Sequence, residues 1–81
     1  MDYDILVDAR GLSCPMPIVK TKQELNKVES GKVIKVLATD KGSVKDFQGF
    51  VNADKNLELI KQDVEKDDQG KDVYVHYIRK K

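Results

Sequence analysis

The chain has 81 residues, a formal net charge of +1 and a single cysteine. This length allows one small domain and no second core, and one cysteine excludes an internal disulfide and a multi-cysteine metal site. Positive and negative charges are intermixed, which argues against direct nucleic-acid binding. No apolar stretch approaches the roughly 18 residues that cross a membrane, and residues 1–4 lack the basic end and apolar run of a signal peptide. We therefore expect a single cytoplasmic domain over residues 1–81 with a reduced thiol.

Residues 3–9 predict a short first strand that ends near Asp8. Apolar side chains alternate with polar ones there, as in a half-buried strand, and they belong to Tyr3, Ile5, Val7 and Ala9. Residues 10–13 then predict a tight connection, in which Gly11 can adopt backbone angles that other residues avoid.

Residues 15–29 have the spacing of a helix, with one stripe formed by Ile18, Thr21, Leu25 and Val28. Pro15 and Pro17 fit its first turn, because the first four backbone N–H groups of a helix have no helical partner. Gly31 is the expected left-handed cap at the end of this helix. This interpretation places Cys14 at or next to the N-cap.

Residues 32–40 are nearly continuously apolar and predict an interior strand. A strand, a helix and a strand in this order form a right-handed crossover, so the two strands should be parallel and end on the same edge. A second helix should follow, capped by Ser43 or Asp40, with a core face made of Val44, Phe47, Phe50 and Val51.

Two further strands are predicted over residues 57–64 and 73–78, joined by a polar hairpin loop with Gly70 in the turn. In the last strand one face consists of Val73, Val75 and Tyr77, and the other of Tyr74, His76 and Ile78. The basic residues 79–81 are expected to fray. The fold class is therefore α/β, a two-layer βαβαββ sandwich with a four-stranded mixed sheet and two helices on one face.

The chemistry is expected in residues 11–17, which contain the only cysteine and both prolines. The positive end of a helix stabilises a thiolate, and the prolines leave chiefly the N–H groups of Met16 and Ile18 as donors in the first turn. Cys14 should therefore be exposed, rigidly presented and more acidic than a free thiol.

Two cations are expected to add positive charge near this thiol, namely Arg10 in the preceding loop and Lys20 on the helix. Lys20 also fits an ordinary solvated helix surface. For Asp8 and Asp40, at the ends of the two parallel strands, a structural role at a strand end or helix cap is as compatible with the pattern as a functional one.

The sequence also excludes several reactions. A second cysteine to resolve a mixed disulfide is absent, so an intramolecular dithiol cycle is impossible. The only histidine, His76, is distant in sequence and is interpreted as a structural or an exposed sheet residue, which predicts neither a Cys–His hydrolytic pair nor a metal site. A lone nucleophilic thiol suits a carrier that accepts an atom from one protein and offers it to another. We expect no metal and no cofactor.

The pattern Asp8-x-x-Gly11-Leu12-x-Cys14-Pro15-x-Pro17 resembles the signature of the TusA/SirA-like sulfur carrier family. Ala38-Thr39-Asp40, followed by Gly42 and a second helix, resembles the second motif of that family. The resemblance covers essentially the whole chain and implies a small βαβαββ domain.

The resemblance implies that Cys14 carries a persulfide. It also implies that Pro15 and Pro17 present this cysteine at the helix start and that Gly11 shapes the loop leading to it. A cysteine desulfurase or another sulfurtransferase would load this persulfide, and the next protein of a relay would receive the sulfur. In this family such relays serve tRNA thiolation, cofactor synthesis, sulfur oxidation or thiosulfate use.

Two alternatives remain open on the sequence. In the first, the protein is a regulatory or scaffolding interaction module, and Cys14 is only a redox-sensitive handle. In the second, it is an autonomous thiol enzyme, which would need a resolving thiol from another chain. The single cysteine makes the second alternative the weaker one.

Overall fold

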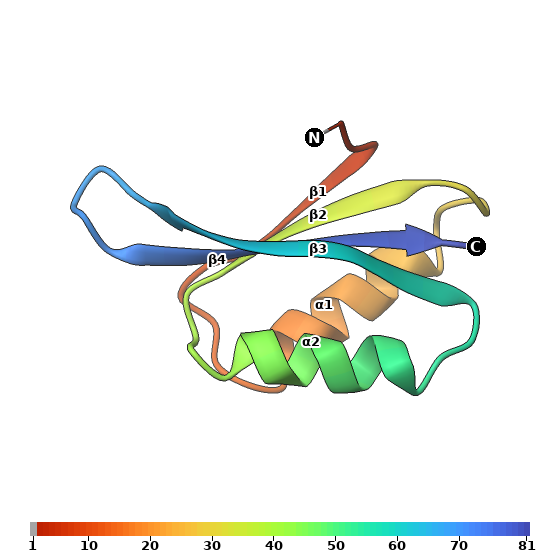
Figure 1. Cartoon of the computed structure of the whole chain (residues 1–81), viewed down its shortest axis with the longest axis horizontal. Helices are drawn as coiled ribbons and strands as arrows, with labels where there is room; N and C mark the ends of the chain where they lie inside the picture. The colour runs from red at the N-terminus through yellow and green to blue at the C-terminus, as the bar shows by residue number, and fades with distance from the viewer. Residues whose placement is uncertain (1) are drawn as a thin grey trace.

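The computed structural model describes residues 2–81 and confirms the βαβαββ order. Figure 1 shows two layers, with both helices on one face of a twisted four-stranded sheet. The predicted fold class is therefore confirmed. The elements are β1 (Ile5–Ala9), α1 (Met16–Leu25), β2 (Val33–Ala38), α2 (Ser43–Asn52), β3 (Leu57–Lys66) and β4 (Asp72–Lys80).

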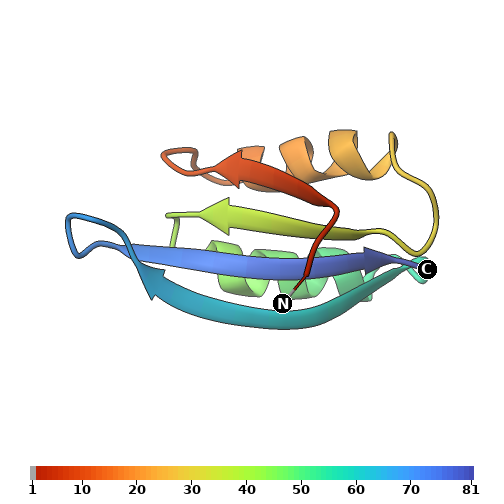
Figure 2. The same cartoon turned by 90° about the horizontal axis from the view of Figure 1, so that it is seen from above.

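The strands lie in the order β1-β2-β4-β3, so the last strand of the chain occupies an interior position (Figure 2). β1 and β2 are parallel, and Ala9 pairs with Ala38, so both strands end at the same edge as predicted. The other two pairings are antiparallel. Because each parallel strand is followed by a helix, both helices begin at this one edge.

The core lies between the helices and the sheet, with Phe47 of α2 fully buried. Its ring stacks on the imidazole of His76 at a centroid distance of 4.5 Å. His76 is also fully buried, and its ring nitrogens are 3.1 Å from the Ser43 hydroxyl and 3.1 Å from the Gln62 amide nitrogen. The structural interpretation of His76 is confirmed.

The opposite face of the sheet carries a second apolar cluster made of Val73, Val75 and Tyr77, the face of β4 that the alternation predicts. Helices do not cover it (Figure 1). Lys35 and Lys61 extend over the Tyr77 ring instead, with their ammonium groups 5.7 and 5.4 Å from its centroid. Their aliphatic stems shield apolar surface, while the charges stay in water.

The end of α1 differs from the prediction. The helix ends at Leu25 and not near Glu29, and Gly31, although its φ is +92°, lies in the turn before β2 and does not cap the helix. Lys80 explains the early end, because its ammonium group donates to the carbonyls of Leu25 and Val28 at 2.7 and 2.9 Å. A cation at a helix C-terminus satisfies carbonyls that have no helical partner.

The basic tail is consequently ordered over most of its length. β4 runs to Lys80, and Arg79 forms an ion pair with Glu58 on β3. The expected fraying of this tail is wrong, because Arg79 pairs with both β2 and β3, and Lys80 pairs with β3 and caps α1. Lys81 lies beyond the strand, and its N–H donates to the Asn56 carbonyl. β3 likewise continues two residues beyond its predicted end, to Lys66.

The start of α2 also differs from the expected side-chain cap. Gly42 occupies the N-cap position, and no side chain donates or accepts a capping bond there. Ser43 instead faces the core, where it contacts His76. Asp40 accepts from the Gly42 N–H at 2.9 Å, which shapes the turn before the helix.

Over residues 2–81, no helix has both the length and the apolar character needed to traverse a lipid bilayer.

Candidate functional site

The two connections that follow β1 and β2 are held together at the edge where these strands end. Gly11 has φ +79°, a left-handed conformation suited to glycine, and its N–H donates to the Thr39 hydroxyl at 2.8 Å. The backbone N–H of Cys14 donates to Asp40 Oδ2 at 3.0 Å. Since Asp40 Oδ1 accepts from Gly42, one carboxylate joins both connections. These bonds lower the pKa of Asp40, the larger contribution coming from Gly42.

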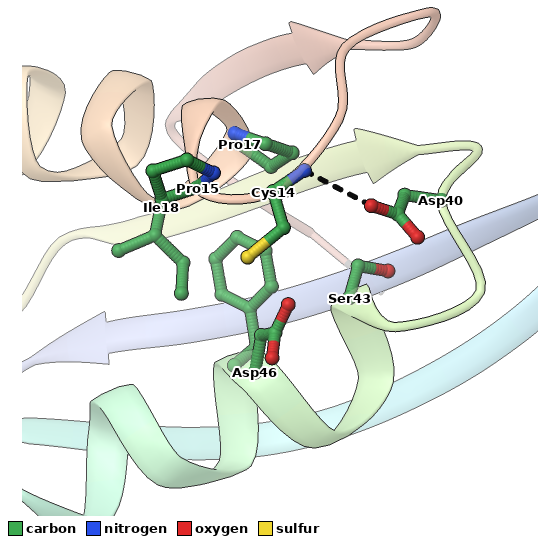
Figure 3. Close-up of a pocket in the computed structure, with 8 residues that line it drawn as sticks. Cys14, Pro15, Pro17, Ile18, Asp40, Ser43 and Asp46 are labelled. Atoms are coloured by element: carbon green, nitrogen blue, oxygen red, sulfur yellow. Dashed lines mark hydrogen bonds between the residues drawn. The ribbon is translucent and has the colours of Figure 1, made fainter.

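Cys14 is exposed and directly precedes Pro15, the N-cap of α1. The Cys14–Pro15 peptide bond is cis. Figure 3 shows the thiol directed away from Asp40 and toward the first turn of α2. It borders a shallow hollow between the starts of both helices that is too narrow to admit a water molecule. The hollow is lined by Cys14, Pro15, Pro17, Ile18, Asp40, Ser43, Asp46 and Phe47. Exposure and presentation at the helix start are thus as predicted.

The predicted acidity of the thiol is wrong. The Met16 N–H donates to the Ser13 carbonyl at 2.9 Å, and the Ile18 N–H to the Pro15 carbonyl at 3.1 Å. The two donors expected at the sulfur are therefore already used. The Asp46 carboxylate, which lines the same hollow, raises the pKa of the Cys14 thiol, with smaller contributions from desolvation and from the charge of Asp40.

Arg10 and Lys20 contribute nothing to this pKa, contrary to the prediction, because both bind Asp8. The Arg10 guanidinium contacts both carboxylate oxygens of Asp8 at 2.9 Å, and Lys20 Nζ donates to the Asp8 carbonyl at 2.9 Å. The hydrogen bonds from Arg10 lower the pKa of Asp8 to about 2. Of the two strand-end aspartates, only Asp40 contacts Cys14, and Asp8 holds the cations instead.

Asp46 is the residue at this site that the sequence analysis missed. It belongs to the first turn of α2 and lies 32 positions after Cys14, so spacing alone does not connect them. The signal was nonetheless present, because parallel strands bring the starts of both following helices to one edge. An acidic residue in the first turn of α2 therefore lies beside the start of α1.

The arrangement suits nucleophilic sulfur chemistry at one atom. The thiol is open to another molecule, and His76 is buried in the core behind Ser43, where it forms no pair with Cys14. Among residues 2–81 no group of three histidine, cysteine, aspartate or glutamate side chains is placed to hold a metal ion. The exposed thiol is accessible to a reacting group on another molecule.

Comparisons with known proteins identify the family of this chain. Residues 5–80 match the model of the family described as sulfurtransferase TusA. A protein of Halobacterium salinarum is 44% identical over 81 residues, covering 98% of this chain and 94% of the relative. The sulfur carrier protein TusA of Allochromatium vinosum is 45% identical over 80 residues, covering 99% and 96%.

The solved structure of a SirA-like protein from Desulfitobacterium hafniense superposes with a TM-score of 0.68 at 24% identity, covering 96% of this chain and 100% of the other, and so shows the same fold. The family model covers nearly all of the chain, and the relatives match along almost their full length. The protein belongs to the TusA sulfurtransferase family.

Proposed function

We propose that this protein is a sulfur carrier that holds a persulfide on Cys14 and relays its outer, sulfane sulfur from a donor protein to an acceptor protein. The exposed position of the only cysteine, at the start of α1 in a chain of the TusA family, is the observation that carries the proposal. Gly11, Pro15 and Pro17 support this position. Asp40 fixes it through the Cys14 N–H.

The transfer balances without an oxidant or a reductant. The Cys14 sulfur attacks the outer sulfur of a donor persulfide, so that a new S–S bond forms at Cys14 and the S–S bond of the donor breaks. The donor cysteine leaves as a thiolate and takes up the proton that Cys14 has lost. Unloading is the same reaction with an acceptor thiol as the attacking group. A second cysteine in this chain is not needed.

Intact-mass spectrometry tests the proposal. After incubation with a cysteine desulfurase and L-cysteine, the protein should gain the mass of one sulfur atom, and dithiothreitol should remove it. Cys14→Ser should abolish the gain. Ser13→Ala is a matched control, because Ser13 is an exposed neighbour whose carbonyl, and not its side chain, accepts from Met16. Failure to gain sulfur from this donor and from a second sulfurtransferase would contradict the proposal.

The proposed partners are those that membership of the TusA family implies. A cysteine desulfurase or another sulfurtransferase supplies the sulfur, and the acceptor serves tRNA thiolation, cofactor synthesis or sulfur metabolism. A reducing compartment such as the cytoplasm fits a carrier whose only thiol is exposed. Cellular complementation separates this proposal from a redox-sensitive interaction module, because only the carrier loses its function with Cys14→Ser.

A further inference from the structure

The loop that carries Cys14 is held by two consecutive side chains of the connection between β2 and α2. The Thr39 hydroxyl accepts from the Gly11 N–H at 2.8 Å. The next residue, Asp40, accepts from the Cys14 N–H through Oδ2 at 3.0 Å. The residue that carries the sulfur is therefore held at its own amide, and not only through its neighbours.

Asp40 uses both of its carboxylate oxygens for backbone donors. While Oδ2 accepts from Cys14, Oδ1 accepts from the Gly42 N–H at 2.9 Å, just ahead of α2. The turn at Gly42 needs only one side-chain oxygen, which asparagine supplies as well as aspartate does. The second bond requires the carboxylate, because an amide would set its NH₂ group against one of the two N–H donors. The contact with Cys14 thus accounts for an aspartate at this position.

The backbone of Cys14 is constrained on both sides. Its N–H is bonded to Asp40, and it is followed by Pro15, whose ring fixes the next backbone dihedral angle. Figure 3 shows the Asp40 bond on one side of the cysteine and the sulfur on the other, directed toward α2. Rotation about the side-chain bonds is the main motion that remains for a sulfur atom attached there.

The charge of Asp40 excludes a role in making the thiol more acidic. A carboxylate near the sulfur opposes ionisation, and Asp40 is accordingly among the smaller contributions that raise the pKa of the Cys14 thiol. Sulfur transfer also requires the attacking sulfur to come within about 3–3.5 Å of the donor sulfur with the reacting orbitals aligned. Placement of the sulfur is the contribution that the hydrogen bonds of Asp40 can make.

We propose that Asp40 is a positioning residue for sulfur transfer, which clamps the Cys14 backbone to the start of α2 so that the sulfur faces its protein partners in one direction. The inference rests on the proposed carrier function and adds a requirement to it. A partner protein presents its reacting sulfur from one direction only, whereas a small reagent approaches an exposed thiol from any open side. Transfer between proteins should therefore depend on the clamp, and reactions with small molecules should not.

Asp40→Asn tests the proposal, because it keeps the size of the side chain but leaves one oxygen for two donors. Single-turnover loading is measured with a cysteine desulfurase already charged with L-cysteine, over a range of carrier concentrations. The limiting rate should fall about tenfold, with little change in the concentration that gives half of this rate. Alkylation by iodoacetamide at pH 7 and loading from inorganic polysulfide should be at least as fast as in the unmodified protein, because a negative charge near the sulfur is removed.

Asp54→Asn is the matched control. Asp54 Oδ1 accepts from the Asn56 N–H at 2.9 Å in a turn of the same kind, but this turn follows α2 and lies at the other end of that helix from Cys14. All three rates should stay near those of the unmodified protein. Thermal melts verify that each variant is folded.

A second pair of variants tests the clamp without changing a charge. Thr39→Val removes the bond to the Gly11 N–H and should also slow loading from the desulfurase. Thr39→Ser keeps the hydroxyl and should recover most of the rate. Because Thr39 is exposed, these variants provide the test even if Asp40→Asn is unstable.

The outcomes separate positioning from other roles. An unchanged limiting rate in Asp40→Asn would overturn the proposal and leave the carrier function intact, and a rise in the half-saturating concentration alone would make Asp40 a contact for the donor instead. Alkylation that slows in step with loading would show that Asp40 acts on the reactivity of the thiol, which also overturns the proposal. Absence of sulfur loading from both donors in the unmodified protein would contradict the carrier function itself.

Discussion

His76 should make the stability of this protein fall as the pH is lowered from neutral to mildly acidic. It is the only histidine, and burial lowers its pKa to about 4 from an ordinary value of 6.5. In the unfolded chain the imidazole binds a proton near pH 6.5, whereas the folded protein resists protonation down to about pH 4. Stability is thus complete above pH 6.5 and is lost progressively between these two values.

The hydrogen bonds explain why the folded state excludes the proton. The Gln62 amide nitrogen donates to the Val44 carbonyl, which can only accept, and Gln48 donates to the Gln62 amide oxygen. The amide nitrogen of Gln62 therefore faces Nδ1 of His76, which must accept. The other ring nitrogen carries the hydrogen and donates to Ser43. Protonation of Nδ1 would set two donors against each other in a buried site.

The difference between the two pKa values corresponds to about 3 kcal/mol when fully expressed, and to about 2 kcal/mol by pH 5. Asp8, with a pKa of about 2 in the folded state, changes stability little in this window, because its contribution is lost mainly below pH 4. Because His76 is the only histidine, a loss of stability between pH 6.5 and pH 4 can be assigned to it.

Urea unfolding followed by far-UV circular dichroism at pH 7, 6, 5 and 4.5 measures the effect. The unfolding free energy of the unmodified protein should decrease by about 2 kcal/mol from pH 7 to pH 5. His76→Gln should be less stable at pH 7 but independent of pH over this range. A flat profile in the unmodified protein, or an NMR titration of the folded histidine near pH 6.5, would refute the reasoning.

Two further predictions compare paired substitutions by urea unfolding at pH 7. Gly11→Ala should destabilise the protein by about 1 kcal/mol, because Gly11 has a positive φ. Gly49→Ala should stabilise it by about 0.5–1 kcal/mol, because Gly49 lies inside α2 with open space around it. Equal effects would contradict the assigned backbone conformations. Phe47→Ala should cost about 3–5 kcal/mol, whereas Val64→Ala, at a residue that is 58% exposed, should change stability by less than about 0.5 kcal/mol. Similar losses for the two variants would place the core elsewhere.

Local patterns were sufficient for most of the fold. The alternation in the last strand correctly separated Val75 from His76, and the parallel crossover rule placed the ends of β1 and β2 at one edge. Gly11 was identified from its position between a strand and a helix, and its positive φ follows from that turn. These features depend on neighbours within one or two elements, which sequence periodicity reports directly.

The features that could not be predicted depend on distant residues. The end of α1 is set by Lys80, 55 positions after Leu25, and the acidity of Cys14 by Asp46. A helix start predicts free N–H donors, but it does not reveal that the Ser13 and Pro15 carbonyls already occupy them. The assumed role of Ser43 as a cap failed because a buried histidine offered its hydroxyl a partner.

The interior position of β4 has a consequence for synthesis on the ribosome. This strand joins β2 to β3, yet it is the last of the four to leave the exit tunnel. Until residues 72–80 emerge, the nascent chain has a pair of strands with nothing to connect it to the third, and α1 lacks the lysine that closes its end. The sheet therefore cannot be completed before residues 72–80 have been synthesised, and a chain that stops short of them lacks the strand that joins β2 to β3.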